Sequence, residues 1–267
     1  MRSPKPVALP DMQGRRVRAF HGGLQVQGGS EVAALDLYDS IGPGGITADA
    51  FRRALNQVRA PRITLRINSP GGDVFDGLAI YNDLVSHPAA VDVEVTGLAA
   101  SAASIVAMAG DTVSMAESAF LMIHKAWAFA IGNAGDLRHT AGVLDQVDVS
   151  LAGIYVNATG QTLEQVNQWM DAETWFSAAD AVGAGFADAV SGQQAGAMAS
   201  LAFDLSGFGR VPAQVKRANE QGLRAAGLSR SEARRAAVTG FELPPADGDE
   251  VEGLRELQAL ARAFRQG

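Results

Sequence analysis

The sequence predicts an α/β fold built on a largely parallel sheet. Two segments, RITLRINS (62–69) and VDVEVTG (91–97), alternate apolar and polar residues with the two-residue period of a strand. Each runs into a turn of small residues that opens a helical pattern. This strand–helix alternation continues to about residue 190, and parallel strands need such helical connections.

The remaining elements follow the same logic of periodicity and capping. Further strands are expected within 31–42, 111–116 and 119–124, with a last strand after residue 188. Helices are expected over 48–58 (capped by Thr47), 74–85, 136–158 and 162–170 (capped by Thr162), and a short helix from residue 177 that ends at Gly183 or Gly185.

Composition divides the chain into four parts. Residues 1–30 form an N-terminal arm, 31–190 the α/β domain, and the Gly-rich 191–200 a linker. Residues 201–267 form a partly helical extension that a partner would order. In this extension we expect helices within 213–238, broken at Gly222 and Gly227, and over 251–264.

Several function classes are disfavoured by composition. A net charge of −7 argues against nucleic-acid binding, because phosphate neutralisation needs a basic face. The absence of cysteine excludes disulfides and Cys-based metal sites, and no cofactor or metal cluster is expected. The sequence contains no GxxxxGK[ST] loop, the motif that would indicate nucleotide hydrolysis. No membrane span or signal-peptide pattern is present, so a cytoplasmic protein is expected.

Two strand-to-helix turns could carry chemistry. In NSPGGD (68–73), Gly71 and Gly72 lack a Cβ, so the backbone can bend sharply and present free N–H groups. In GLAAS (97–101), Ser101 precedes a helix whose first amide, that of Ala102, is a possible donor. Ser101 is either a helix cap in a close-packed turn or a nucleophile. Ser104, one turn later, is interpreted as a packing residue.

A serine nucleophile needs a base and an acid that orients it. Of the four histidines, His124 alone ends an apolar strand, where α/β active sites gather. His21, His87 and His139 fall on polar or surface stretches. The segment MDAETWFSA (170–178) supplies two acids, Asp171 and Glu173.

Four segments, taken in their order along the chain, resemble the ClpP serine peptidase family. They are INSPGGDVFDGLAIYNDL, GLAASAASIVAMAGD, FLMIH and TGQTLEQVNQWMDAETWFSAADAVGAGFADAV. The resemblance covers residues 31–190 and implies a ClpP/crotonase-like core with a long helix as handle. It implies that Ser101 is the nucleophile and His124 the general base. The backbone N–H groups of Gly72 and Ala102 would form the oxyanion hole.

The family's third catalytic residue, usually Asp, aligns with Glu173, and Asp171 is the alternative. Lys125-Ala126-Trp127 replaces the family's usual Gln-Pro after the histidine. Lys125 therefore suggests an alternative in which it pairs with Ser101 as a Ser-Lys dyad. This alternative is disfavoured because neighbouring side chains on a strand, here those of His124 and Lys125, point to opposite faces.

The basic arm and the long extension resemble the ClpP-related head-maturation (prohead) proteases of tailed phages and prophages. This implies an ATP-independent serine endopeptidase that processes capsid or scaffold proteins in the bacterial cytoplasm or within proheads. It also implies a homo-oligomeric ring, with the helix 136–158 at subunit contacts, and no nucleic-acid or membrane partner. The alternatives are a crotonase-like acyl-CoA enzyme and a catalytically inactive capsid-assembly or scaffolding factor.

Overall fold

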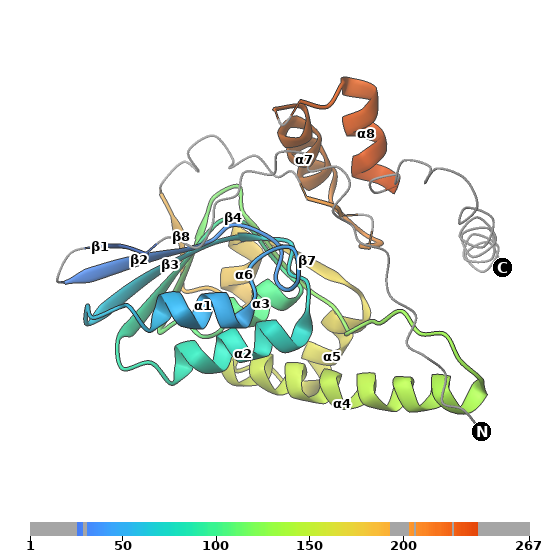
Figure 1. Ribbon diagram of the computed structural model, residues 1–267, viewed down its shortest axis with the longest axis horizontal. Coiled ribbons are helices and arrows are strands. Elements are labelled where there is room, and N and C mark those ends of the chain that lie inside the picture. Colours follow the sequence, from blue (N-terminus) through green and yellow to red (C-terminus); the bar gives the residue numbers. More distant parts are fainter. Residues whose placement is uncertain (1–25, 29–30, 193–202, 206, 226, 240–267) are drawn as a thin grey trace.

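The computed structural model describes residues 26–28, 31–192, 203–205, 207–225 and 227–239. Within these residues the centre of the fold is an eight-stranded sheet of order β1-β2-β3-β4-β5-β8, with β6 paired to β4 and β7 (Figure 1). The strands are β1 (Val26–Gly28), β2 (Val32–Leu37), β3 (Arg62–Ser69), β4 (Ala90–Ala100), β5 (Thr112–Ala116), β6 (Phe120–Ile123), β7 (Thr174–Ser177) and β8 (Ala189–Ser191).

The predicted α/β fold with its largely parallel sheet is confirmed. β2, β3, β4 and β5 pair in parallel, as do β4 with β6 and β5 with β8. The alternating residues of β3, Ile63, Leu65 and Ile67, are fully buried. Burial of such apolar rows on one face of the strands is the main stabilising term of the sheet.

Helices cover the sheet on both faces. They are α1 (Ala48–Leu55), α2 (Val74–Val85), α3 (Ala102–Ala107), α4 (Ala134–Thr159), α5 (Leu163–Asp171), α6 (Ala178–Ala184), α7 (Ala213–Ala225) and α8 (Arg230–Thr239). Figure 1 shows α1, α2 and α3 on one side of the sheet and α7 and α8 beyond the other. The expected caps are present, since the side chains of Thr47 and Thr162 accept backbone N–H groups at the starts of α1 and α5.

Strand β4 is the element that positions the site. Its first half pairs with β5, and its last three residues, Leu98–Ala100, pair with β6. β3 lies alongside β4 as far as Ser69. The carboxyl ends of β3, β4 and β6 therefore meet at one edge of the sheet, where ligand sites of α/β proteins form.

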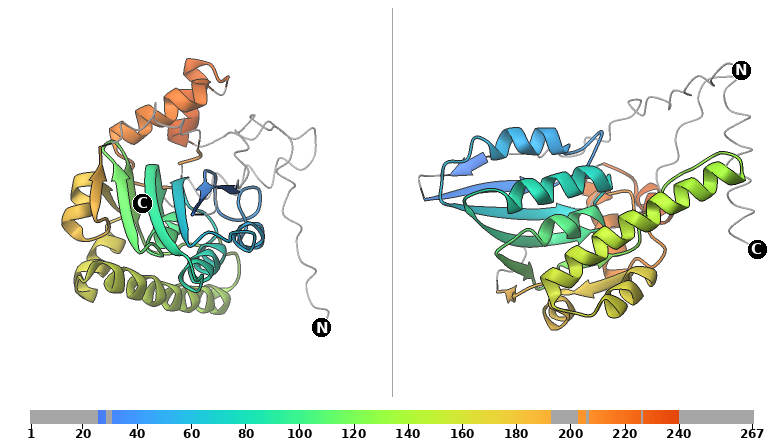
Figure 2. Two further views of the ribbon diagram at one scale, coloured as in Figure 1. Left: turned by 90° about the vertical axis from the view of Figure 1, so that its left-hand side faces the viewer. Right: turned by 90° about the horizontal axis from the view of Figure 1, so that it is seen from below.

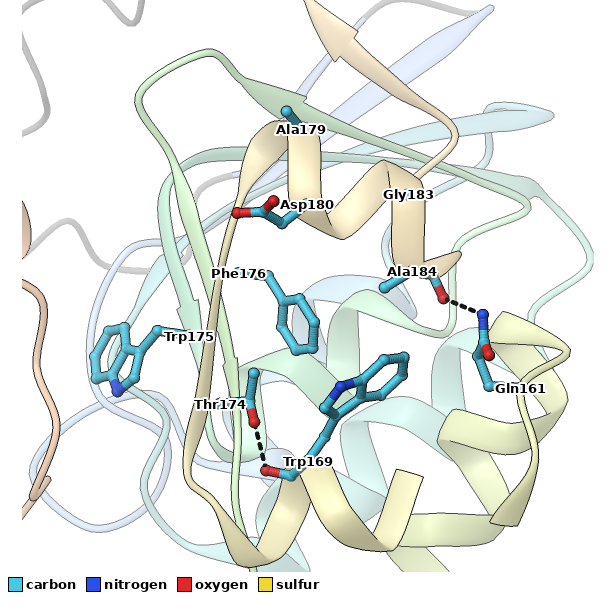
Figure 3. A pocket seen from close by; sticks show the side chains of 9 residues that line it. All are labelled: Gln161, Trp169, Thr174, Trp175, Phe176, Ala179, Asp180, Gly183 and Ala184. Carbon is cyan, nitrogen blue, oxygen red and sulfur yellow. Dashed lines mark hydrogen bonds between the residues drawn. The ribbon is translucent and has the colours of Figure 1, made fainter. Parts of the chain in front are cut away.

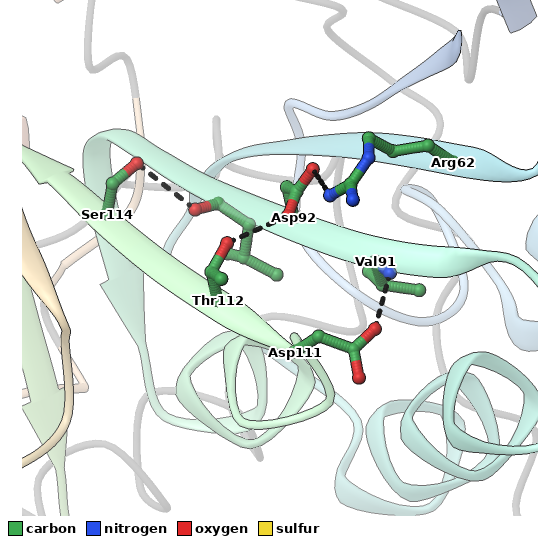
Figure 4. A network of polar contacts seen from close by, with 7 residues as sticks. Arg62, Val91, Asp92, Asp111, Thr112 and Ser114 are labelled. Atoms are coloured by element: carbon green, nitrogen blue, oxygen red, sulfur yellow. Dashed lines mark hydrogen bonds and ion pairs between the residues drawn. The ribbon is translucent and has the colours of Figure 1, made fainter. Parts of the chain in front are cut away.

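A polar network links β3, β4 and β5 at the end of the sheet opposite the site (Figure 4). Asp92 bridges Arg62 of β3 and Thr112 of β5, and Asp111 accepts the N–H of Val91. The hydrogen bond from Arg62 holds the pKa of Asp92 below its ordinary value. The network connects residues at the starts of three strands, far from the candidate site.

Four local predictions need correction. The sequence analysis identifies no strand within residues 1–30, but β1 pairs antiparallel with β2. The strand predicted over 91–97 continues to Ala100, because it gains β6 as a neighbour. β7, which the sequence analysis missed, is a four-residue antiparallel partner of β6. Gly222 is buried inside α7 rather than breaking it, and the break is at Gly227, whose φ of 103° suits glycine.

The sequence predicts that a partner orders the extension, but the part of it that the structure describes packs on the sheet of this chain. Leu205, Val211 and Val215 form a buried cluster with Leu98 and Met122 of the sheet. Residues 1–25, most of the linker and the helix expected over 251–264 lie outside the described residues. No helix in the described part of the chain is long and apolar enough to cross a membrane.

Candidate active site

The turns after β3, β4 and β6 bring the predicted residues together. Ser101 follows β4 directly, and its backbone N–H donates to the carbonyl of Met122 in β6 at 2.9 Å. His124 follows β6 directly. The register of two parallel strands thus places serine and histidine side by side, and the His124 Nε2 lies 2.8 Å from the Ser101 Oγ.

Ser101 is not a helix cap. It occupies the position before α3, but its side chain makes no capping hydrogen bond. Its backbone has φ 54° and ψ −127°, a region that residues other than glycine rarely adopt. Strained residues of this kind persist where surrounding contacts fix them, and they cluster at active sites. This conformation directs the hydroxyl toward His124.

Gly71 and Gly72 are required by the turn after β3. Both have positive φ, 84° and 145°. A Cβ on Gly71 would collide with the Ala100 carbonyl oxygen and come within 2.8 Å of the Ala102 nitrogen. A Cβ on Gly72 would collide with the carbonyl oxygen of Ile41. The turn therefore lies directly against the nucleophile's own turn.

Two backbone N–H groups are unused at this contact. The bonds that flank Gly72 run from Ile41 to the Gly71 carbonyl and from Asp73 to the Ile41 carbonyl. Among the described residues, the N–H groups of Gly72 and Ala102 donate to no other group. Free amides next to a serine are the donor set that a developing oxyanion needs.

His124 is half-buried, and burial lowers the pKa of its imidazole. The negative charges of Glu173 and Asp148 act in the opposite direction and raise it. The ring edge also contacts Phe208, with ring centroids 5.7 Å apart. A neutral imidazole at neutral pH is therefore favoured, which is the form that accepts a proton.

The predicted third acid, Glu173, does not hydrogen-bond to His124. Its carboxylate accepts the N–H groups of Gly209 at 2.8 Å and Arg210 at 2.7 Å, both from the extension. It also accepts the indole N–H of Trp175 at 3.2 Å. In the described part of the chain, no carboxylate hydrogen-bonds to His124. Glu173 acts on the imidazole through its charge.

Asp171 pairs with Lys125 rather than with His124. Its carboxylate lies 2.6 Å from the Nζ of Lys125, and both side chains are about half exposed. The same hydrogen bond raises the pKa of Lys125, which keeps the ammonium protonated. A protonated, exposed lysine paired with Asp171 is not a base for Ser101.

The other residues considered fall outside the site. Ser104 was interpreted as a packing residue, but its hydroxyl makes two hydrogen bonds, to the Ser101 carbonyl and to Tyr155. His139 is exposed on α4, and His87 accepts the N–H of Ala89 at the end of α2. His21 lies outside the described residues.

A groove of about 760 Å³ leads to Ser101 and His124. Its walls are mostly apolar and include Phe75, Trp127 and Phe208. A second pocket, of about 500 Å³, lies between α5, β7 and α6 (Figure 3). Of the residues drawn there, Trp169 and Phe176 point into it and Asp180 is the one acid, so it offers no nucleophile–base pair.

Comparison with known proteins agrees with this geometry. The family model described as Clp protease matches residues 54–194, more than half of the chain. The chain belongs to the Clp protease family. The match includes both glycines, Ser101, His124 and Glu173.

Relatives in the Clp protease family include three bacterial proteins named ATP-dependent Clp protease proteolytic subunit 1. The protein of Leifsonia xyli subsp. xyli is 34% identical over 47% of this chain and 65% of its own length. That of Corynebacterium jeikeium is 35% identical over 48% and 69%. That of Mycobacterium tuberculosis is 30% identical over 47% and 64%. The chain thus covers about two thirds of the length of these relatives. More than half of this chain lies outside its alignments with them.

Sequence reasoning missed four residues that the fold adds to this Clp protease site. Phe208 and the amides of Gly209 and Arg210 reach it from the extension, and Asp148 reaches it from α4 by accepting the N–H of Ala126 at 2.7 Å. A family pattern that ends near residue 190 carries no signal for the extension. Among the described residues, no group of three His, Asp or Glu side chains could hold a metal ion.

Proposed function

We propose that the chain is a serine endopeptidase with Ser101 as nucleophile and His124 as general base. The observation that carries the proposal is the 2.8 Å contact between the His124 Nε2 and the Ser101 Oγ beside the free amides of Gly72 and Ala102. Nucleophile, base and oxyanion donors are the three elements of acyl transfer by serine.

The reaction begins when a peptide lies in the apolar groove with its carbonyl next to Ser101. His124 takes the proton of the Ser101 hydroxyl as the oxygen attacks the carbonyl carbon. The carbonyl oxygen then carries negative charge and accepts hydrogen bonds from Gly72 and Ala102. Each such donor contributes about 3 to 4 kcal/mol to the barrier reduction.

Collapse of the tetrahedral intermediate breaks the peptide C–N bond, and His124 returns the proton to the leaving amine. Water, deprotonated by the same imidazole, then hydrolyses the acyl-enzyme and restores Ser101. Glu173 stabilises the imidazolium that forms in both steps. Its charge raises the pKa of His124, although its oxygens are held by Gly209 and Arg210.

A fluorophosphonate probe followed by intact-mass measurement tests the activity. We expect one adduct on the wild-type chain, mapped to Ser101, and none on Ser101→Ala. The crotonase-like alternative, in which backbone amides polarise a thioester, predicts no adduct and acyl-CoA turnover instead. An unlabelled wild-type chain that retains its fold by circular dichroism would overturn the peptidase proposal.

We further propose that the peptidase processes phage capsid or scaffold protein in the bacterial host cytoplasm, without ATP hydrolysis of its own. The extension after residue 190, which reaches the site through Phe208, and the basic residues of the arm support a role distinct from docking to an unfoldase. The test is co-expression with a candidate coat or scaffold protein. Processing by wild type and its loss in Ser101→Ala are expected. If both the wild-type and the Ser101→Ala chains promote capsid assembly and neither cleaves the candidate protein, the result would favour an inactive scaffolding factor.

A homo-oligomeric ring is proposed with α4 at its contacts. The first half of this 26-residue helix projects beyond the sheet (Figure 2), and Leu137, Val143 and Val149 are exposed on it. A helix that projects from its own domain can bury such exposed apolar side chains against a neighbouring subunit. Light scattering should give a mass of several chains, and Val149→Lys should lower it.

A further inference from the structure

A buried chain of hydrogen bonds runs from α4 to the turn that carries the nucleophile. The Tyr155 hydroxyl lies 2.7 Å from the Ser104 Oγ, and the Ser104 Oγ donates to the Ser101 carbonyl at 2.6 Å. Tyr155 is 1% exposed and Ser104 is fully buried. The proposed chemistry uses neither side chain, so it does not explain why these two hydroxyls are buried in contact with each other.

The direction of this chain follows from counting hydrogens. A serine hydroxyl has one hydrogen, and that of Ser104 is used on the Ser101 carbonyl. The Tyr155 hydroxyl must therefore donate to Ser104. Burial raises the pKa of Tyr155, so its hydroxyl keeps the proton that it donates. The order is Tyr155 O–H to Ser104 O–H to Ser101 C=O.

The accepting carbonyl belongs to the peptide unit that supplies an oxyanion donor. The C=O of Ser101 and the N–H of Ala102 are the two ends of one planar, trans peptide. Fixing the carbonyl end fixes where the N–H points. The ψ angle of Ser101, −127°, sets this plane in an uncommon backbone conformation, so its orientation depends on outside contacts.

We propose that Ser104 and Tyr155 are positioning residues for the oxyanion hole. They hold the Ser101–Ala102 peptide so that the Ala102 N–H faces the reacting carbonyl, and they polarise that N–H, since hydrogen bonds in a chain strengthen one another. The inference rests on the proposed peptidase function and deepens it. Neither side chain touches the substrate; both act through the peptide of the nucleophile.

The expected effect of losing the Ser104 hydroxyl is moderate, because the backbone N–H of Ser104 also donates to the Ser101 carbonyl, at 2.9 Å. Ser104→Ala removes one of two donors. We expect kcat to fall about 5- to 30-fold, less than the roughly 10²- to 10³-fold that follows loss of an oxyanion donor itself. KM should stay unchanged, because the substrate's ground state gains little from this amide.

The experiment compares Ser104→Ala, Tyr155→Phe and the double variant for kcat, KM and inhibition by a peptide aldehyde. The aldehyde forms a hemiacetal with Ser101 whose oxygen occupies the oxyanion hole. Ser104→Ala should weaken aldehyde inhibition by the same factor as kcat. Tyr155→Phe should show a smaller loss, and the double variant no more than Ser104→Ala, because Tyr155 acts through Ser104.

Thermal stability separates positioning from a structural role. Ser104→Ala leaves the buried Tyr155 hydroxyl without its acceptor, so the double variant should be more stable than Ser104→Ala while equally slow. Val166→Ala, a buried truncation in α5, is the matched control: it should lower the melting temperature and leave kcat and aldehyde inhibition unchanged.

Two results would overturn the proposal. One is unchanged kcat and aldehyde inhibition in Ser104→Ala and Tyr155→Phe. The other is a loss of activity that follows melting temperature across all variants, Val166→Ala included. If Ser104→Ala does not fold, Tyr155→Phe, which removes a single oxygen, decides alone. Failure of the peptidase function itself would be seen separately, as a wild-type chain that is not labelled.

Discussion

The carboxylate of Glu173 accepts the backbone N–H of Arg210 at 2.7 Å, across 37 residues of sequence. The extension therefore contacts the acid of the proposed triad. The loop 207–211, which includes Arg210, also brings Phe208 against His124. Acid, base and extension therefore form one structural unit.

Glu173→Gln tests whether Glu173 acts through its charge. We expect kcat/KM to fall about 10- to 100-fold, less than the roughly 10⁴-fold loss when a hydrogen-bonded triad carboxylate is neutralised. Asp171→Asn is the matched control and should change kcat/KM by no more than a few-fold, because that acid is exposed and paired with Lys125. The reverse ranking in steady-state peptide cleavage would assign the role to Asp171.

The pH dependence should reflect the buried His124. Burial disfavours the imidazolium, so the pKa lies below its ordinary value of 6.5, and kcat/KM should rise with pH through that lower pKa and level off above it. Glu173→Gln removes a charge that raises this pKa, so its acidic limb should move to still lower pH. A wild-type limb above pH 6.5, or a shift to higher pH in the variant, contradicts the assignment.

Gly71→Ala should abolish activity and lower stability. The residue has φ 84°, and a Cβ would collide with the Ala100 carbonyl beneath the nucleophile's turn. The backbone conformation alone costs about 1 to 3 kcal/mol for a residue with a side chain. Gly183→Ala, in α6 with open space around the new Cβ, should keep full activity and stability. Denaturation curves and fluorophosphonate labelling give both readouts, and an active Gly71→Ala would refute the close-packed turn.

Asn219→Ala should release the extension from the site. Asn219 is fully buried in α7 and bonds both the N–H and the C=O of Phe203, each at 2.9 Å. Its loss leaves buried polar groups unpaired, at a cost of about 1 to 3 kcal/mol each. Hydrogen exchange should become faster at the amides of Gly209 and Arg210. Unchanged exchange there would mean that Glu173 holds the loop without help from α7.

Much of the candidate site could be predicted from the sequence because its residues mark local backbone events. Gly71, Gly72 and Ser101 stand where strands turn into helices, and these turns require small residues with unusual backbone angles. His124 stands at the end of an apolar strand. Periodicity and caps placed the neighbouring elements for the same reason: they depend on residues within one or two turns of the chain.

Contacts between distant segments could not be predicted in this way. β7 is four residues long, too short for a clear period, and exists because β6 offers its free edge. The backbone partners of Glu173 lie 36 and 37 residues away, and the partners of Ser104 include Tyr155, 51 residues away. No local pattern distinguishes a glutamate that bonds an imidazole from one that bonds two amides.

The sequence by itself indicated the α/β class and two small-residue turns, and its resemblance to the ClpP family singled out Ser101 and His124. The tertiary structure decided what surrounds that pair: which groups hold Glu173, what covers His124, and which hydroxyls hold the Ser101 carbonyl. The physical reason is how far along the sequence each interaction reaches. Backbone conformation is set by neighbouring residues, whereas hydrogen-bond partners are set by how strands and helices pack after the chain has folded.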